Sequence, residues 1–186
     1  LKSQNSDFNL LCLPTSNFPT FDDKFEIEKI EIEKKKFLSL LNKTKISISN
    51  DDTRHYLNGV YLHATESNKN TFLTGVATDS HRLSSSSIAV DNVKSFTSII
   101  IPRKTVFQLC SLLDNVDEKL FIQTSSNKIK FSLGKIKLIS KVIDGKFPDY
   151  QKVVPKENTK TLTVSSQDFI NSVERVASVS IDRKEG

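Results

Sequence analysis

The segment GVYLHATESNKNTFLTGVATDSHRLSSSSIAV, residues 59–90, decides the fold of this chain. It contains three runs with the length and composition of short strands, and polar turn residues separate them. These runs predict strands over residues 59–65, 70–78 and 82–90. Because only a few residues connect one run to the next, we expect the strands to pair antiparallel.

A helix is expected on each side of this segment along the chain. Residues 34–48 place four apolar residues on one helical stripe, namely Phe37, Leu38, Leu41 and Ile48. A second helix is predicted to begin at Pro102, since proline suits the first helical position. Its apolar stripe has the i, i+3, i+4, i+7 spacing of an amphipathic helix and consists of Val106, Leu109, Cys110 and Leu113.

Further strands flank these helices. Residues 8–13 form one strand-like run, and residues 25–33 alternate between apolar and charged residues with a break in register near Lys29. After the second helix, strands are predicted over residues 119–124, 127–133 and 135–143.

The last two of these strands predict a hairpin that turns at Gly134 and has one dry face and one lysine face. The residues expected on the dry face are Ile129, Phe131, Leu133, Ile136, Leu138 and Val142. The residues expected on the lysine face are Lys128, Lys130, Lys135, Lys137 and Lys141.

The order of elements predicts an α+β fold in which antiparallel sheets are each backed by a helix. The two halves of the middle region, residues 25–93 and 94–150, have similar layouts. The Gly- and Pro-containing stretch DGKFPDYQKVVP, residues 144–155, is typical of a connection between domains.

The pattern then starts again. A strand is predicted over residues 160–164 and a helix over residues 165–179, with Ser165 and Asp168 as a capping box. The apolar stripe of this helix is Phe169, Val173, Val176 and Ala177. We therefore expect tandem-repeat domains, with the end of one in residues 1–24, a complete one in residues 25–150 and the start of another in residues 155–186.

Composition limits the class of protein. The 186 residues are 37% hydrophobic and 26% charged, as in an ordinary globular protein. The net charge of +5 is uneven, since residues 1–93 hold 11 basic and 12 acidic residues, and residues 94–186 hold 16 and 10. A local positive excess is typical of a surface that meets polyanions, although a merely solvated lysine-rich surface is equally compatible with it.

The cysteines and the lack of targeting signals indicate in which cellular compartment the protein is expected. Cys12 and Cys110 lie far apart and outside any metal-binding or disulfide spacing, which indicates a reducing environment. The sequence contains no apolar run long enough to span a membrane and no signal peptide, so we expect a cytoplasmic protein without membrane partners. Because the chain lacks methionine altogether, we expect it to be a piece of a longer protein.

The stretch VATDSHRLS, residues 76–84, contains the side chains of a hydrolytic or metal site. Adjacent residues on an extended chain point to opposite faces, so Asp79, Ser80 and His81 are poorly arranged for a triad. A metal site at Asp79 and His81 needs a third ligand, and only His63 or Asp91 is available, without supporting spacing. None of the glycines lies in a nucleotide-binding pattern. We predict no catalytic residue, no metal and no cofactor.

The stretch TRHYLNG, residues 53–59, favours binding over catalysis. Arg54, His55 and Tyr56 place a cation and two rings together, and such a group can contact phosphates and bases. Packing of Tyr56 or Leu57 in the core is equally compatible with the pattern. Two alternatives therefore stay open at this point: a stand-alone single-stranded nucleic-acid module that uses TRHY and the lysine hairpin, and a hydrolase built on residues 79–81.

Four motifs, in order along the chain, resemble one family. They are TRHYLNGVYL (53–62), VATDSHRLS (76–84), IIPRKTVFQL (100–109) and SKVIDGKFPDYQKVVP (140–155). Together they resemble the bacterial DNA polymerase III beta subunit, the sliding clamp. The resemblance implies the DNA-clamp fold and a non-enzymatic processivity factor that encircles duplex DNA as a head-to-tail homodimer.

The resemblance also implies partners and sites. Polymerase III, the clamp loader and repair polymerases are expected to insert short Leu/Phe peptides into a pocket. The residues implied for that pocket are Leu57, Thr78, Ser80, His81, Arg82, Leu83, Pro148 and Val153. The residues implied for DNA contact are Arg54, His55, Tyr56, Arg103, Lys104 and Lys152. Two of these positions depart from the family pattern, because Ser80 stands where glycine is common and His55 where tyrosine is frequent.

Overall fold

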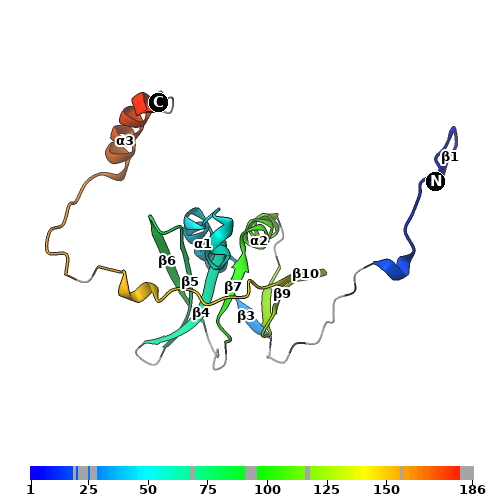
Figure 1. The fold of residues 1–186 in the computed structure, drawn as a ribbon, viewed down its shortest axis with the longest axis horizontal. Coiled ribbons are helices and arrows are strands. Elements are labelled where there is room, and N and C mark those ends of the chain that lie inside the picture. Colours follow the sequence, from blue (N-terminus) through cyan, green and yellow to red (C-terminus); the bar gives the residue numbers. More distant parts are fainter. Residues whose placement is uncertain are drawn as a thin grey trace. The chain divides into compact units, whose positions relative to one another are not determined.

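The computed structural model describes residues 1–18, 20, 25, 29–67, 70–90, 96–115, 118–155 and 157–180. The chain forms two compact units, Leu1–Phe147 and Pro148–Gly186. The first unit contains two four-stranded antiparallel sheets, drawn in Figure 1. Among its described residues, the second contains one α-helix.

The three strands predicted from residues 59–90 are confirmed and belong to the first sheet, of order β6-β5-β4-β7. Its strands are β4 (Gly59–Ser67), β5 (Asn70–Thr78), β6 (Leu83–Ala89) and β7 (Ile99–Pro102). The second sheet has the order β10-β9-β8-β3. Its strands are β3 (Ile30–Ile32), β8 (Leu120–Thr124), β9 (Lys128–Leu133) and β10 (Ile136–Lys141).

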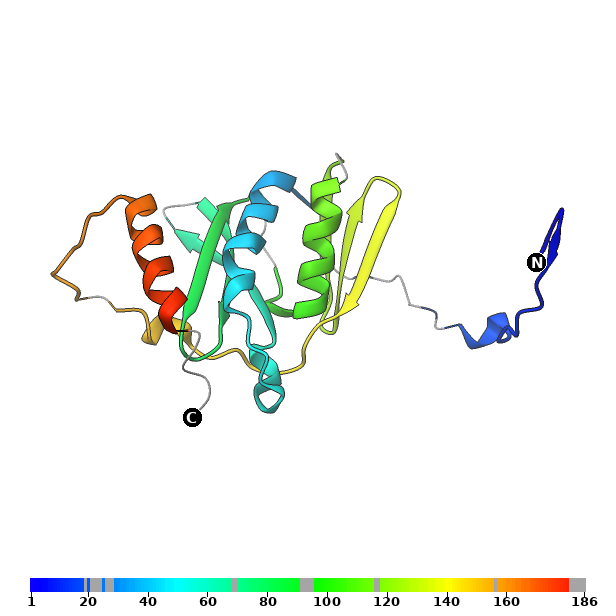
Figure 2. The same cartoon turned by 90° about the horizontal axis from the view of Figure 1, so that it is seen from above.

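Helices α1 (Lys34–Thr44) and α2 (Arg103–Asn115) lie side by side over the same side of the two sheets, as Figures 1 and 2 show together. Short 3-10 turns complete the unit: η1 (Thr15–Asn17), η2 (Lys45–Ser47) and η3 (Asp52–Leu57). The predicted α+β class, with helices backing antiparallel sheets, is therefore confirmed.

The two halves of the unit exchange strands. Strand β7 begins the second half but pairs with β4 of the first, and β3 begins the first half but pairs with β8 of the second. Each half thus contributes the fourth strand to the sheet of the other, so both sheets contain strands from both halves. The sequence pattern showed the similar layouts but not this exchange.

Strand β7 was missing from the prediction, and the start of the second helix was wrong by one residue. Ile99, Ile100 and Ile101 are all at most 4% exposed, which is typical of a short continuous apolar strand that is buried on both faces. Pro102 is the last residue of β7, and helix α2 begins at Arg103. Proline fits the end of a strand at the sheet edge, where its missing N–H costs no hydrogen bond.

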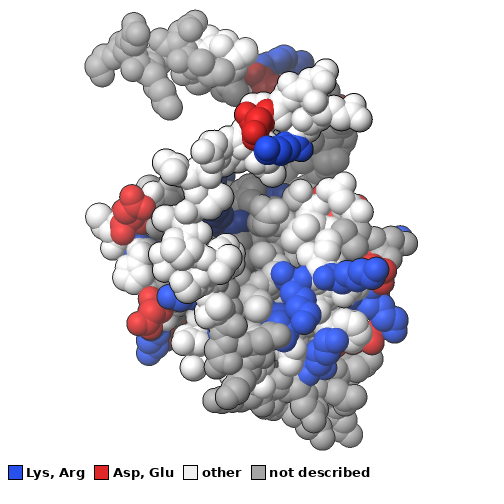
Figure 3. Space-filling view, turned by 90° about the vertical axis from the view of Figure 1, so that its right-hand side faces the viewer, with Lys and Arg blue, Asp and Glu red and all other residues white. Residues whose placement is uncertain are grey.

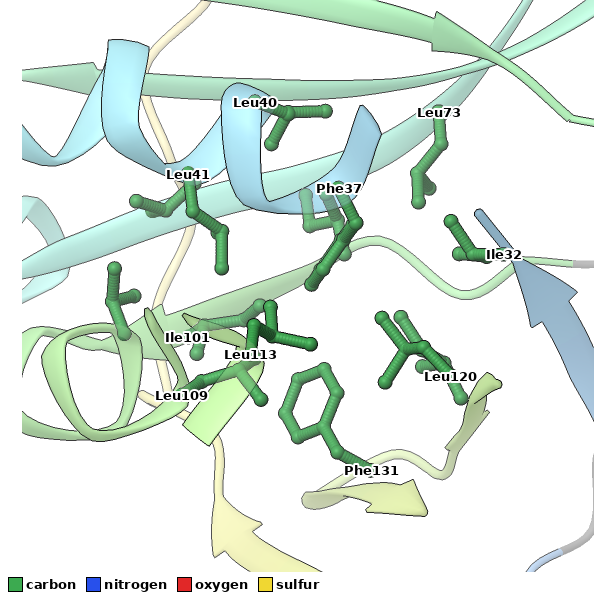
Figure 4. Close-up of a cluster of buried hydrophobic side chains, with 14 of the residues drawn as sticks. Ile32, Phe37, Leu40, Leu41, Leu73, Ile101, Leu109, Leu113, Leu120 and Phe131 are labelled. Carbon is green, nitrogen blue, oxygen red and sulfur yellow. The ribbon is translucent and has the colours of Figure 1, made fainter. Parts of the chain in front are cut away.

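The core lies between the helices and the sheets (Figure 4). All four residues of the predicted α2 stripe are buried. In α1 the stripe shifts slightly: Phe37 and Leu41 are fully buried, Leu38 is only half-buried, and Leu40 joins the core. The rings of Phe37 in α1 and Phe131 in β9 have centroids 6.1 Å apart, so the core joins the two halves.

The predicted hairpin of β9 and β10 is confirmed, with Gly134 in the turn at a φ of 53°. Its predicted lysine face is partly covered by an aromatic ring, however. The ammonium nitrogens of Lys130 and Lys128 lie 4.7 Å and 5.0 Å from the centroid of the Phe25 ring, and Lys130 is only 8% exposed. The lysines that do face solvent here are Lys135, Lys137 and Lys141. Figure 3 shows Lys and Arg side chains gathered over one area of the face in view, with acidic side chains beside them.

Three predicted strands need correction. Residues 8–13 are exposed and irregular, and the strands near them are instead β1 (Lys2–Ser3) and β2 (Ser6–Asp7). Residues 160–164 are also irregular. A strand requires a partner for its backbone hydrogen bonds, and neither segment has one among the described residues. Of the predicted strand over residues 25–33, the part Ile30–Ile32 forms β3. Residues 26–28, next to the expected break near Lys29, lie outside the described part of the chain.

The second unit contains the 3-10 turn η4 (Tyr150–Lys152) and helix α3 (Ser166–Ser180). The Ser165 hydroxyl oxygen accepts the N–H of Asp168 at 3.4 Å, so the predicted N-cap is confirmed. Phe169 and Val173 of the predicted stripe are 55% and 51% exposed. Among the described helices of both units, none has the length and apolarity to cross a membrane.

Candidate functional site

The stretch 76–84 contains the end of β5, a tight turn over residues 79–82 and the start of β6. The carboxylate of Asp79 accepts the backbone N–H groups of His81 and Arg82, both at 3.0 Å, and the Nε of Arg82 at 3.1 Å. These hydrogen bonds hold the pKa of the Asp79 carboxyl below its usual value, and the bond from the Arg82 N–H has the largest effect. Asp79 therefore stabilises the turn, which is a structural role and not the orientation of a catalytic imidazole.

Ser80, at the tip of this turn, has a φ of 75°. It is the one non-glycine residue with positive φ in the described part of the chain. The left-handed conformation costs an ordinary residue about 1–2 kcal/mol, which explains why glycine suits this position. The Thr78 hydroxyl supports the turn from the other side, since it accepts the N–H of Ser80 at 3.2 Å and donates to the Arg82 carbonyl at 2.8 Å.

The turn η3 carries the TRHY motif, and Asp51 organises it. One Asp51 oxygen accepts the Thr53 hydroxyl and N–H, at 2.6 Å and 2.9 Å, and the other accepts the Nε of Arg54 at 2.8 Å. The Thr53 contacts, with Arg54 contributing after them, lower the pKa of Asp51 to about 2. Asp51 is therefore an ionised partner of Arg54 at neutral pH.

The guanidinium of Arg54 joins the two motifs. Its Nη1 donates to the Ser80 hydroxyl oxygen at 2.6 Å, across 26 residues of sequence. The resemblance implied DNA contact for Arg54 and the peptide pocket for Ser80. The structure places the two side chains in direct contact.

Three of the residues implied for DNA contact line one hollow of about 460 Å³: His55, Arg103 and Lys104. Asp52, Asn58 and Ile143 contribute to the same hollow. A backbone hydrogen bond joins two residues of its lining, since the N–H of Arg103 donates to the Asn58 carbonyl at 2.9 Å. His55 and Tyr56 form an edge-to-face pair on η3, with centroids 5.9 Å apart. Lys152, the remaining candidate, belongs to the second unit.

Phe107 lies beside Arg103, which lines this hollow, and was not among the site residues predicted from the sequence. It lies on α2 outside the apolar stripe and is 43% exposed. The Arg103 guanidinium and the Lys45 ammonium lie 5.0 Å and 5.5 Å from its ring centroid, within the range of cation–π contacts. The sequence did contain a signal for this residue, because it is an aromatic residue directly next to a position of the buried apolar stripe.

The residues implied for the peptide pocket differ in exposure. In the first unit Leu57 is 3% exposed, Thr78 and Leu83 are half-buried, and Ser80, His81 and Arg82 are exposed. An aliphatic side chain beside an exposed polar turn is suitable for capturing an apolar peptide group. Pro148 and Val153 lie in the second unit, where both are exposed.

The metal alternative gains no support. Within the described residues, no group of three or more His, Cys, Asp or Glu side chains is placed to hold a metal ion, and Asp91 lies outside them. His63 is 7% exposed and belongs to an aromatic stack, since its ring lies 4.9 Å from that of Tyr61, which in turn lies 4.8 Å from that of Phe147. Burial lowers the pKa of His63 and favours its neutral form.

Comparisons with known proteins agree on one family. The family described as "DNA polymerase III beta subunit, central domain" matches residues 31–149. The beta sliding clamp of Caulobacter vibrioides is 36% identical over 98% of this chain, and that of Escherichia coli K12 is 34% identical over 100% of it. The chain spans about half the length of these curated relatives, 50% in both cases.

Solved structures give the same result. A beta sliding clamp of Caulobacter crescentus superposes with a TM-score of 0.85 at 36% identity, over 88% of this chain and 44% of that one. A sliding clamp of Bartonella birtlesii bound to griselimycin superposes with a TM-score of 0.82 at 40% identity, over the same shares of the two chains.

Proposed function

The chain belongs to the DNA polymerase III beta subunit family, and from this premise we propose that it is part of a bacterial sliding clamp. The match of residues 31–149 to the central domain of that family carries the proposal. We further propose that residues 1–24 end a first clamp domain, residues 25–150 form the second and residues 155–186 begin the third. The whole protein is then a non-catalytic head-to-tail homodimer that encircles duplex DNA in the cytoplasm.

Contact with DNA is assigned to six residues: Arg54, His55, Tyr56, Arg103, Lys104 and Lys152. The hollow lined by His55, Arg103 and Lys104 supports this assignment, because cationic and imidazole groups converge there on one side of the unit. Such groups attract phosphates regardless of base sequence, and the attraction falls as salt rises. Weak contacts of this kind allow sliding, while enclosure by the ring provides the residence time.

Topological retention is the expected behaviour on DNA. After the clamp loader assembles the protein on nicked circular duplex DNA, it should stay bound through gel filtration in high salt. Cutting the circle should release it, because a ring slides off an open end. Linear DNA whose ends are blocked by tightly bound protein is the matched control and should retain it. Equal, strongly salt-dependent binding to open linear DNA or to single-stranded oligonucleotides would support the single-stranded nucleic-acid module instead.

The second proposed activity is the docking of partner peptides from polymerase III, the clamp loader and repair polymerases. The residues assigned to the pocket are Leu57, Thr78, Ser80, His81, Arg82, Leu83, Pro148 and Val153. The half-buried Leu83 beside the polar 79–82 turn supports it, since an apolar anchor with a polar rim suits short-peptide capture. A Bartonella birtlesii relative that is bound to griselimycin further supports the presence of a ligand site.

Leu83→Asp is expected to weaken binding of a fluorescent Leu/Phe-containing pentapeptide at least about tenfold, because a charge would replace the apolar anchor. Fluorescence anisotropy measures the affinity. Ile136→Asp is the matched control, since Ile136 is also an aliphatic residue at the first position of an edge strand and is 37% exposed. Unchanged affinity in Leu83→Asp, or equal loss in both variants, would contradict the assignment.

A further inference from the structure

A second hollow lies on α2, next to the hollow that His55 lines. It measures about 420 Å³, and its lining consists of Arg103, Lys104, Phe107, Gln108 and Ser111. Arg103 and Lys104 line both hollows, so the two adjoin at the start of α2. Phe107 supplies the aromatic ring of the second hollow and is 43% exposed.

Two cations from different helices lie over this ring. The guanidinium carbon of Arg103 is 5.0 Å from the ring centroid, and the ammonium nitrogen of Lys45 is 5.5 Å from it. Arg103 is one helical turn before Phe107 on α2, whereas Lys45 directly follows the last residue of α1. The ring therefore fixes the positions of two charges whose long side chains would otherwise lose much rotamer freedom on meeting a ligand.

The described part of the chain provides no carboxylate partner for either cation. No acidic side chain there forms an ion pair with Lys45 or Arg103. Arg54 of the neighbouring turn η3 differs, because the Asp51 carboxylate lies 2.8 Å from its Nε. A cation over an aromatic ring keeps its net charge, since the ring has none. Lys45 and Arg103 are therefore better suited than Arg54 to an anionic ligand.

We propose that Lys45 and Arg103 contact neighbouring phosphates of duplex DNA, and that Phe107 is a positioning residue that holds both cations for this contact. The inference rests on the proposed DNA-encircling function and adds Lys45 and Phe107 to the six residues assigned there. A phosphate backbone is the ligand chemistry that fits, because it presents single negative charges at a regular spacing. Cations that are ordered before DNA arrives lose less entropy on binding, so the ring raises affinity without contacting the DNA.

The test is the salt dependence with which the full protein binds a short open-ended duplex, measured by fluorescence anisotropy without the clamp loader. Lys45→Gln is expected to lower the slope of log affinity against log salt concentration by about one, as the loss of one phosphate contact does. Arg103→Gln should have the same effect. Lys135→Gln is the matched control, since Lys135 is exposed at the turn of the β9–β10 hairpin, and it should leave the slope unchanged.

Two variants of Phe107 test the positioning role. Phe107→Leu keeps an apolar side chain but removes the ring, so it should weaken duplex binding about two- to fivefold, the equivalent of one exposed cation–π contact. Phe107→Tyr keeps the ring and should recover the native affinity. In a protein that already carries Lys45→Gln and Arg103→Gln, Phe107→Leu should have no further effect, because it acts only through these two cations.

The outcomes separate the inference from the function on which it rests. If the native protein is retained on nicked circular DNA but Lys45→Gln keeps the native salt slope, the Lys45 contact is wrong and the clamp function stands. A lower midpoint of thermal unfolding in Phe107→Leu with unchanged duplex affinity would show a purely structural role and overturn the positioning role. If the native protein is not retained on the circle and does not bind the duplex, the clamp function fails, and the inference fails with it.

Discussion

Phe37→Ala is expected to lower the free energy of unfolding of the first unit by about 3–5 kcal/mol, the range for truncation of a buried phenylalanine. Phe37 is fully buried in α1, and its ring meets that of Phe131 in β9, 6.1 Å away between centroids. The change therefore removes apolar contacts and leaves a cavity where the helix layer joins the second sheet. Urea denaturation followed by circular dichroism measures the effect.

Phe107→Ala is the matched control for that experiment. Phe107 is also on a helix of the same layer, but it is 43% exposed, and the cationic groups of Arg103 and Lys45 lie over its ring. We expect it to cost no more than about 1 kcal/mol, which is the value of an exposed cation–π contact. Similar losses in the two variants would contradict the packing described for the core.

Gly59→Ala is expected to destabilise the unit by about 3 kcal/mol, near the upper end of overpacking effects. A Cβ at position 59 would lie 2.2 Å from the backbone carbonyl oxygen of Ile101 in β7. Gly59 pairs with Pro102 in the β4–β7 ladder, and that ladder holds the second half of the unit to the first. The backbone cannot yield here without disrupting the strand exchange, so both sheets should lose stability together.

Gly75→Ala distinguishes this effect from a general cost of adding a methyl group. Its Cβ would lie 2.5 Å from Cδ2 of Leu40, the far end of a flexible side chain that can repack. We expect a loss of about 1 kcal/mol, at the lower end of the same range. Chemical denaturation of both variants gives the comparison, and an equal or larger loss for Gly75→Ala would show that the β4–β7 contact is not critical.

Local patterns predicted most of the elements. Periodicity and turn residues were sufficient to predict several elements, because those signals act over a few positions. These elements are the strands β4, β5 and β6, the hairpin of β9 and β10, and the apolar stripe of α2. The predictions failed where a partner strand decides the outcome. Residues 8–13 and 160–164 have strand-like composition without a ladder, whereas β7 pairs with β4 as a short apolar run in front of a proline.

The candidate site was likewise predictable from the sequence only in part. The motifs around Arg54 and Ser80 could be recognised in the sequence, and so could the departure from glycine at position 80. Their contact could not, because the two residues are 26 positions apart and meet only after β4 and β5 have paired. Lys130 is a second example, since its alternation predicted a solvent-facing lysine and the Phe25 ring covers it.

By itself, then, the sequence determined the family, the class of fold and most of the helices and strands between residues 34 and 141. These depend on residue types and spacings that are present in any conformation of the chain. Only the tertiary structure decided that the two halves exchange β3 and β7, and that Arg54 holds the Ser80 turn. Such contacts join distant positions, so they exist only once the chain has paid the entropy of bringing those positions together.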